Sequence, residues 1–146
     1  MRAIVKTTAE PSGLALLDWK EPVPEPGQVK MKVTGAGICG TDIHIIRGTW
    51  ISRPPVVLGH EWCGEIVETG AGVTHLKPGD RVTASNPART CGHCYYCTAG
   101  NPFHCADRVS AGYMIDGALQ SMMAPRRSMA RGDPRRPQGS SLTPAR

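Results

Sequence analysis

The sequence predicts a mainly β protein, folded as a partly open β-barrel or a β-sandwich, and three observations favour this class. Short runs of Val, Ile and Leu recur along the chain and are separated by Pro and Gly. In residues 29–33 (VKMKV), apolar and polar side chains alternate, which is typical of an antiparallel strand with one buried face. Only residues 41–48 have the pattern of a helix. Many short strands with a single small helix favour a barrel or a sandwich.

The expected elements follow from where Pro and Gly interrupt the apolar runs. Pro-Gly pairs predict tight turns within residues 22–28 and 76–81. The helix is expected to begin with Thr41 as its N-cap and to stop at Gly48. Strands are predicted at residues 2–7, 14–19, 29–35, 55–59, 65–69 and 81–84.

The length and the charge distribution set limits on the class of protein. A chain of 146 residues is long enough for one domain with a core and too short for two ordinary ones. The net charge is +5, but residues 1–124 hold eleven basic and eleven acidic side chains. The opening residues lack the apolar segment of a signal peptide, and no apolar run is long enough to span a bilayer. We therefore expect a cytoplasmic protein with no membrane partner.

The basic surplus lies in residues 125–146, which hold six Arg and one Asp. This segment is rich in Arg, Pro, Gly and Ser, has no periodicity and offers few apolar side chains, so a disordered tail is expected. A nucleic-acid-binding arm is the alternative. It is disfavoured because no aromatic side chains alternate with the arginines to stack on bases.

Four of the six cysteines form a dense cluster within residues 91–105. In a reducing compartment such a cluster is more typical of a metal site than of disulfides. Structural zinc takes four tetrahedral ligands, and C-x2-C steps bring consecutive thiolates to one ion. His93 or His104 is an alternative ligand. The cluster, with the spacing C-x2-C-x2-C-x7-C, predicts a closed structural site at Cys91, Cys94, Cys97 and Cys105.

A second group of candidate ligands is spread over two segments. A catalytic zinc needs only two or three protein ligands and an open position, often from separate loops. Cys39, His60 and Glu61 fit that description. Thr41 and His44 follow the first ligand closely enough to reach a molecule bound at the metal. Each of these residues has a plainer interpretation when taken alone, as a buried Cys, a turn residue or a helix cap.

The motifs around these residues resemble those of the zinc-dependent medium-chain alcohol dehydrogenases, in their N-terminal GroES-like catalytic domain. The segment CGTD-x-H at 39–44 and the four-cysteine spacing both match that family, in the family's order. The resemblance covers residues 1 to about 117 and is strongest to the polyol and threonine dehydrogenase branch. The family's zinc signature, GHE-x2-G-x5-G-x2-V, is matched at every fixed position, by Gly59, His60, Glu61, Gly64, Gly70 and Val73.

The resemblance implies a GroES-like partly open β-barrel over residues 1–124, with a zinc lobe at 91–105 and two zinc ions per chain. The structural ion would lie on the four clustered cysteines. The catalytic ion would lie on Cys39, His60 and Glu61, where Glu61 is either a ligand or a neighbour of the metal.

The same resemblance implies a reaction. Hydride would pass from a small alcohol or polyol to NAD or NADP, while Thr41 and His44 relay the alcohol proton. Trp50 would lie near the substrate pocket or serve packing equally well. Cys63 is not a family ligand and is expected in the core.

We expect the family's Rossmann domain to be missing, since the sequence contains no dinucleotide fingerprint. The near match GAGVTH at 70–75 has His in place of the third Gly. After about residue 117 the resemblance fades, so we expect a truncated or frameshifted dehydrogenase. Such a chain should bind zinc, lack activity alone and self-associate through exposed barrel surface. The alternative function is a stand-alone structural zinc module whose basic tail binds nucleic acid or an acidic partner.

Overall fold

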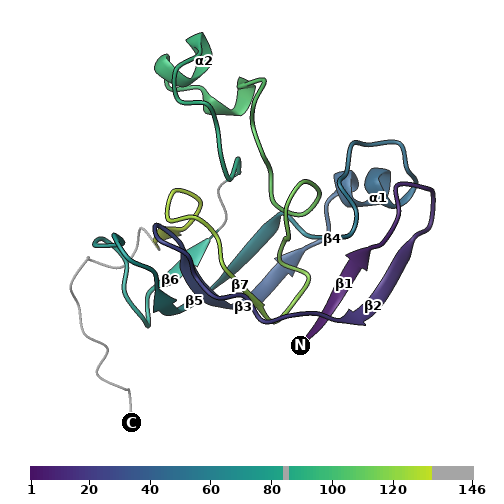
Figure 1. Ribbon diagram of the computed structural model, residues 1–146, viewed down its shortest axis with the longest axis horizontal. Helices are drawn as coiled ribbons and strands as arrows, with labels where there is room; N and C mark the ends of the chain where they lie inside the picture. Colours follow the sequence, from purple (N-terminus) through teal and green to yellow (C-terminus); the bar gives the residue numbers. More distant parts are fainter. Residues whose placement is uncertain (84–85, 133–146) are drawn as a thin grey trace.

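The computed structural model describes residues 1–83 and 86–132, and in this part of the chain two antiparallel sheets form a partly open barrel (Figure 1). The mainly β prediction is therefore confirmed. One sheet has the order β2-β1-β4 and the other the order β7-β3-β5-β6-β8. The elements are β1 (Arg2–Lys6), β2 (Leu14–Asp18), β3 (Val29–Gly37), α1 (Gly40–Ile46), β4 (Val56–Val57), β5 (Glu61–Thr69), β6 (Arg81–Thr83), α2 (Tyr95–Thr98), the 3-10 helix η1 (Pro102–His104), β7 (Met122–Met123) and β8 (Arg131–Gly132).

The two sheets are joined by residues 117–121, which hydrogen-bond to both. The Gly117 amide donates to the carbonyl of Val57, the last residue of β4, and the Ile4 amide in β1 donates to the carbonyl of Leu119. On the other side, the Val33 amide in β3 donates to the carbonyl of Ser121. This segment therefore holds the smaller sheet against the larger one.

The core of the larger sheet follows the two-residue period of its strands. On β3, Val29 and Met31 are fully buried between outward-facing lysines. On β5, Trp62 and Ile66 are buried on either side of Gly64. A side chain at Gly64 would overlap the Lys32 carbonyl and the methyl group of Met31, so the close approach of β3 and β5 requires glycine there.

Each of the six predicted strands is present, but β5 begins at Glu61, four residues earlier than expected. The expectation missed these residues because Gly64 interrupts the apolar alternation. The longer strand corrects the expectation for Cys63, which is exposed. Since Trp62 and Gly64 face inward, the strand period turns Cys63 outward.

The predicted helix is also present, but its N-cap lies two residues earlier than expected. Cys39 is the N-cap of α1, in place of the expected Thr41, and Gly48 follows the helix with a positive φ of 71°. The Cys39 amide donates to Oδ2 of Asp42 at 2.9 Å, as in one arm of a capping box. The helix therefore begins at a candidate metal ligand.

The expected tail differs from the structure over residues 125–132. β8 pairs with β6, and Met129 and Ala130 are buried in the main core. Arg127 donates to the carbonyl of Gly72 at 2.7 Å. Composition alone misses this packing because two apolar side chains are enough to anchor a short segment to an existing sheet edge. The rest of the expected tail, residues 133–146, lies outside the described residues.

The loop that carries α2 and η1 projects away from both sheets (Figure 1). Its two ends meet at a narrow neck, where the Val109 amide donates to the Arg89 carbonyl at 2.8 Å and the Ala88 amide donates to the Val109 carbonyl at 2.8 Å. Within residues 1–83 and 86–132, no helix is both long and apolar enough to cross a membrane.

Candidate metal centres and the adjoining pocket

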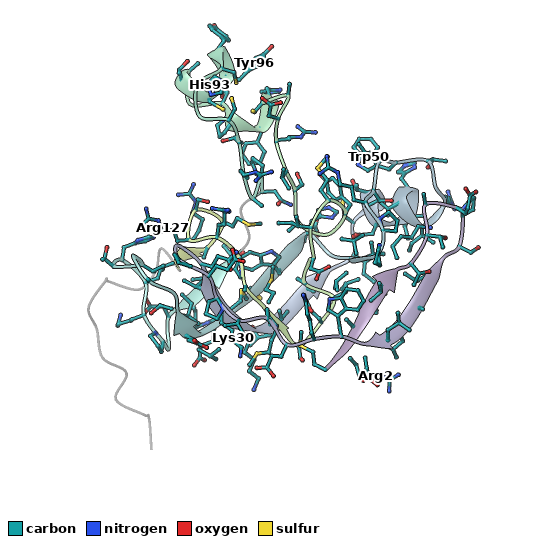
Figure 2. All side chains as sticks on the ribbon, viewed as in Figure 1. Arg2, Lys30, Trp50, His93, Tyr96 and Arg127 are labelled. Carbon is teal, nitrogen blue, oxygen red and sulfur yellow. The ribbon has the colours of Figure 1, made fainter. Side chains whose placement is uncertain are left out.

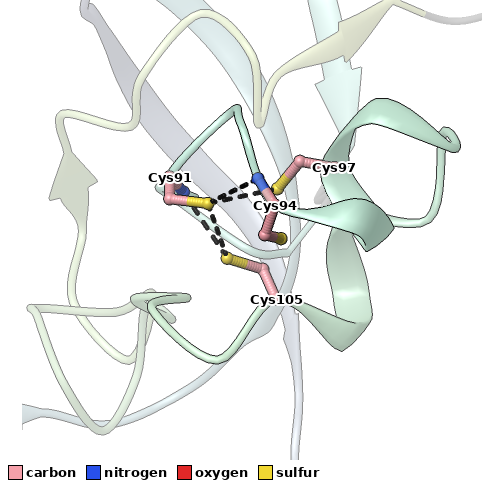
Figure 3. A group of neighbouring side chains, drawn as sticks. All are labelled: Cys91, Cys94, Cys97 and Cys105. Atoms are coloured by element: carbon pink, nitrogen blue, oxygen red, sulfur yellow. Dashed lines mark hydrogen bonds between the residues drawn. The ribbon is translucent and has the colours of Figure 1, made fainter.

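The projecting loop brings the four clustered cysteines together (Figure 3). Their sulfur atoms all lie within 4.8 Å of one another, and each thiol is free. Sγ of Cys91 lies 3.9 Å from Sγ of Cys97 and 3.7 Å from Sγ of Cys105. A disulfide requires about 2.05 Å, so these contacts are not disulfides.

The same distances fit zinc. A tetrahedron of four sulfur atoms about 2.3 Å from a central ion has edges of about 3.8 Å. The two histidines of the lobe stay outside the cluster, since His93 contacts the Cys91 carbonyl through Nδ1 at 3.0 Å and His104 packs on the ring of Tyr96. The four cysteines alone therefore supply a donor set suited to a closed zinc site.

The electrostatics of this cluster also favour a cation. Backbone amides of His93 and Cys94 lower the pKa of Cys91 to about 6, because their N–H groups stabilise the thiolate. The Cys97 amide favours the thiolate of Cys94, but burial and the neighbouring thiols outweigh it and raise the pKa of Cys94 to about 11. Four thiolates cannot gather here without a positive charge among them, and a divalent ion would supply it.

The second candidate centre combines residues at the start of α1 with residues at the start of β5. Cys39 precedes α1, and Glu61 opens β5 directly after His60. Their donor atoms lie within 4.8 Å of one another. Gly59 has a positive φ of 93°, a conformation that glycine adopts without strain, and it turns the chain from β4 into β5. The set of one sulfur, one nitrogen and one carboxylate suits zinc and leaves a fourth position open.

Asp42 completes this centre, and the sequence interpretation missed it. Its side chain is 1% exposed, and Oδ1 lies 3.4 Å from Nδ1 of His60. In the described part of the chain, neither of these two atoms has a hydrogen-bond partner of ordinary length. A carboxylate behind a histidine ligand fixes the ring orientation and leaves Nε2 for the metal. Asp42 could have been singled out from the sequence, because it is the fourth residue of the CGTD segment that begins with Cys39.

The contact between Asp42 and His60 shifts both pKa values. Asp42 raises the pKa of His60 to about 9 by stabilising the imidazolium against the opposing effect of burial. Burial by itself raises the pKa of Asp42, but His60 and the amides of Cys39 and Gly59 outweigh it, so the pKa is lowered. The pKa of Cys39 is also lowered, chiefly by the Thr41 amide and then by His60. The centre is therefore prepared to hold a thiolate beside a positive charge.

The two predicted relay residues lie in different surroundings. Oγ1 of Thr41 accepts from Sγ of Cys39 at 3.8 Å, so Thr41 lies at the candidate metal centre. Nδ1 of His44 lies 3.2 Å from Oγ1 of Thr49, and that hydroxyl also donates to the His44 carbonyl at 3.2 Å. Among the described residues, no hydrogen bond joins Thr41 to His44.

A pocket of about 460 Å³ lies at the C-terminal end of α1. Trp50, at 47% exposure, forms part of its wall, and its side chain lies at the surface and not in the core (Figure 2). The pocket is lined by His44, Arg47, Thr49 and Trp50. A second aromatic side chain, Tyr113, meets the ring of His60 edge-on at 5.9 Å between ring centres.

Comparison with known proteins places these features in a family. Residues 25–131 match the model of the alcohol dehydrogenase GroES-like domain. The chain is 44% identical to a sorbitol dehydrogenase of Halalkalibacterium halodurans over 119 residues, which cover 82% of this chain and 35% of that protein. It is 46% identical to an L-threonine 3-dehydrogenase of Streptomyces avermitilis over 128 residues, 85% of this chain and 37% of that protein.

Solved structures of dehydrogenases superpose on this chain. A zinc-binding dehydrogenase of Sinorhizobium meliloti 1021 bound to NADP superposes with a TM-score of 0.84 at 34% identity, covering 92% of this chain and 38% of that one. Galactitol-1-phosphate dehydrogenase of Escherichia coli superposes with a TM-score of 0.82 at 28% identity, again over 92% of this chain and 38% of that one. The chain thus spans little more than a third of the length of these relatives.

Proposed function

The chain belongs to the alcohol dehydrogenase GroES-like domain family, and from that premise we propose that it supplies the catalytic domain of a zinc-dependent alcohol or polyol dehydrogenase that uses NAD or NADP. The observation that carries the proposal is the convergence of Cys39, His60 and Glu61 from separate segments into one donor set. A stand-alone structural zinc module would need only the four-cysteine lobe. It would not require this second, open centre.

The residues of the open centre have separable roles in the proposed reaction. Cys39, His60 and Glu61 would hold a zinc ion, which acts as a Lewis acid toward an alcohol oxygen when bound. Asp42 orients the ring of His60 from behind. Thr41, whose hydroxyl already contacts the Cys39 thiol, is placed to accept the proton that leaves the alcohol.

His44 is suited to take the proton onward. Because the Thr49 hydroxyl donates its hydrogen to the His44 carbonyl, it must accept one from Nδ1 of the ring. The neutral ring therefore carries its hydrogen on Nδ1 and leaves Nε2 free to accept a proton. We propose that Nε2 of His44 is the exit for the alcohol proton.

The cofactor is proposed to bind elsewhere. A nicotinamide accepts hydride in this class of reaction. The described residues contain only antiparallel strand pairs and no βαβ unit, so we assign no dinucleotide site to them and expect no turnover from these residues alone. The cytoplasm is the proposed compartment, since six free thiols persist under reducing conditions.

Self-association, if the chain is studied alone, is proposed to begin on β2. Leu14, Leu16 and Leu17 of this edge strand are 46%, 55% and 37% exposed. An edge strand with three exposed leucines offers both apolar surface and unpaired backbone groups.

Cobalt substitution tests the proposed function. The chain is loaded with Co²⁺ in place of zinc, and two ions per chain are expected. Addition of a small alcohol or polyol should change the visible absorption of the ion at Cys39, His60 and Glu61, while the four-thiolate ion stays unchanged. A Cys39→Ser variant should lose the responsive ion only. A spectrum that no alcohol changes, with both ions bound, would contradict the proposal.

A further inference from the structure

The pocket beside α1 contains a cation that the proposed chemistry does not use. Arg47 is the C-cap of α1 and lines the pocket together with His44, Thr49 and Trp50. The pocket has a volume of about 460 Å³ and is open to solvent, since all four lining residues are exposed. A guanidinium stays protonated at all physiological pH values and presents a planar set of N–H donors.

No carboxylate in the described part of the chain neutralises this guanidinium. The ion pairs there are Lys30 with Glu21, His60 with Asp42, and Lys77 with Asp80, and none includes Arg47. Its side chain also makes no hydrogen bond with the described residues, so its donors are available to a ligand. Arginine donors in this state are suited to bidentate contact with an oxyanion.

A second cation strengthens the positive potential at this end of the helix. The side chain of Lys6 is fully buried, and its Nζ donates to the carbonyls of Glu10 and Ile46. Ile46 is the last residue of α1 and precedes Arg47. The carbonyls at a helix C-terminus carry partial negative charge, which would otherwise weaken anion binding nearby. Lys6 offsets that charge, so the field of Arg47 is not cancelled.

The position of the pocket relative to the metal centre defines the ligand further. Cys39 and Arg47 flank the seven-residue helix α1, and the eight steps between their Cα atoms correspond to about 12 Å along the axis. His44 lines the pocket and lies between the two. A molecule whose hydroxyl group reaches the metal centre therefore needs a chain of several carbons to place an anion at Arg47. Trp50 offers a flat apolar wall for that chain.

We propose that this pocket binds the terminal oxyanion, a phosphate or a carboxylate, of a polyol substrate, and that Arg47 selects such substrates over neutral polyols. The inference rests on the proposed function, because it assigns the other end of the molecule to the metal centre. Thr49 is not assigned to the anion, because its hydroxyl is hydrogen-bonded to the ring and the carbonyl of His44. Arg47 is thus the specificity-determining residue of the pocket.

The test measures binding to the zinc-loaded full chain by titration calorimetry. The probes are glucitol, glucitol 6-phosphate, gluconate and inorganic phosphate. We expect at least one of the two charged polyols to bind at least tenfold more tightly than glucitol, and inorganic phosphate to compete with it. Arg47→Gln should abolish the preference, and Arg47→Lys should retain part of it, because a lysine keeps the charge but not the planar donors.

Arg2→Gln provides the matched control. It removes the same charge from an exposed arginine at the start of β1, away from Trp50 (Figure 2), and should leave the preference intact. Equal affinity for the neutral and charged polyols, failure of inorganic phosphate to compete, or a preference that survives Arg47→Gln in a folded variant would overturn the inference.

Removal of the metal separates this inference from the proposed function. Binding of glucitol should require the metal, whereas the competition by inorganic phosphate should persist in metal-free protein and still depend on Arg47. Metal-dependent glucitol binding without an Arg47-dependent preference would refute the anion pocket alone. Arg47-dependent phosphate binding, with glucitol binding that ignores the metal, would refute the proposed metal chemistry alone.

Discussion

Oδ1 of Asp42 lies 3.4 Å from Nδ1 of His60, and the carboxylate is almost completely buried behind the imidazole. The pair links the first turn of α1 to the residue before β5, so it orients a candidate metal ligand and also ties two segments together. Because the pair has both roles, changes to it should affect metal binding and the pH dependence of that binding.

Asp42→Ala should weaken zinc binding at the Cys39, His60 and Glu61 centre by about 10- to 100-fold, because the His60 ring loses its orienting partner. Competition with a chromophoric chelator measures the affinity of each site separately. The four-cysteine site serves as the internal control and should keep its affinity. Equal losses at both sites would point to general unfolding and would contradict a local role for Asp42.

Zinc binding at the same centre should depend on pH with a defined sign. The pKa of His60 in the metal-free protein is about 9, above its ordinary value of 6.5, and the ring must lose that proton to bind metal. Apparent affinity should therefore rise with pH up to about 9. The stabilisation that the charged His60 gives the metal-free fold is complete below pH 6.5 and is lost as pH rises to 9.

NMR titration of the His60 ring in metal-free protein checks this prediction. Asp42→Asn should move the midpoint down, since the neutral amide no longer stabilises the imidazolium. Asp107→Asn, which removes an exposed carboxylate in the loop after η1, should leave it unchanged. The same midpoint in wild type and Asp42→Asn would show that the carboxylate does not act on His60.

Cys97→Ser should remove one zinc ion per chain and release the lobe, while the barrel stays folded. The lobe has little packing of its own, because neither α2 nor η1 contains a buried residue. Elemental analysis gives the metal count, and amide exchange compares the lobe with the strands. Cys63→Ser is the control, since this exposed thiol lies outside both clusters. An unchanged metal count in Cys97→Ser would exclude the four-thiolate site.

Gly64→Ala should destabilise the protein by about 1–3 kcal/mol, because the added methyl group would overlap the backbone of β3. Denaturant unfolding of the zinc-loaded chain measures the free energy difference. Gly40→Ala is the matched control, as a methyl group there meets nothing within 4 Å. It should be neutral or slightly stabilising in the first turn of α1. Similar losses for both variants would contradict the close packing of β3 and β5.

Met129→Ala should cost about 2–5 kcal/mol, since its side chain is fully buried in the main core. Ser128→Ala changes the exposed neighbour and should have little effect. The comparison tests whether residues 125–132 form part of the folded domain. A Met129→Ala variant as stable as wild type would restore the expectation of a tail that begins at residue 125.

The strands and the four-cysteine lobe could be predicted from sequence because their signals are local. A two-residue period marks a strand such as β3, and the C-x2-C steps mark the lobe. The second centre was proposed from its residue types and then supported by motif resemblance, and the structure brings Cys39, His60 and Glu61 together. Periodicity alone would not have joined two segments twenty residues apart.

The features that sequence reasoning missed depend on contacts between distant segments. Asp42 looks like an ordinary helix-cap residue until β5 places His60 beside it. Met129 looks like part of a polar tail until β8 pairs with β6. Cys63 looks apolar, but its exposure depends on which side of β5 faces the core, and Trp62 decides that. The surroundings of each of these three residues can be assigned only when the segment that packs against it is known.

The neck formed by Arg89 and Val109 has a consequence for how this domain can diversify. Because the two ends of the loop are hydrogen-bonded neighbours, the chain enters and leaves the lobe at nearly the same point. Residues 91–105 therefore form an insertion that can lengthen, shrink or be replaced by a short turn without shifting the strands. The lobe therefore joins the barrel at a neck held by three backbone hydrogen bonds among Ala88, Arg89 and Val109.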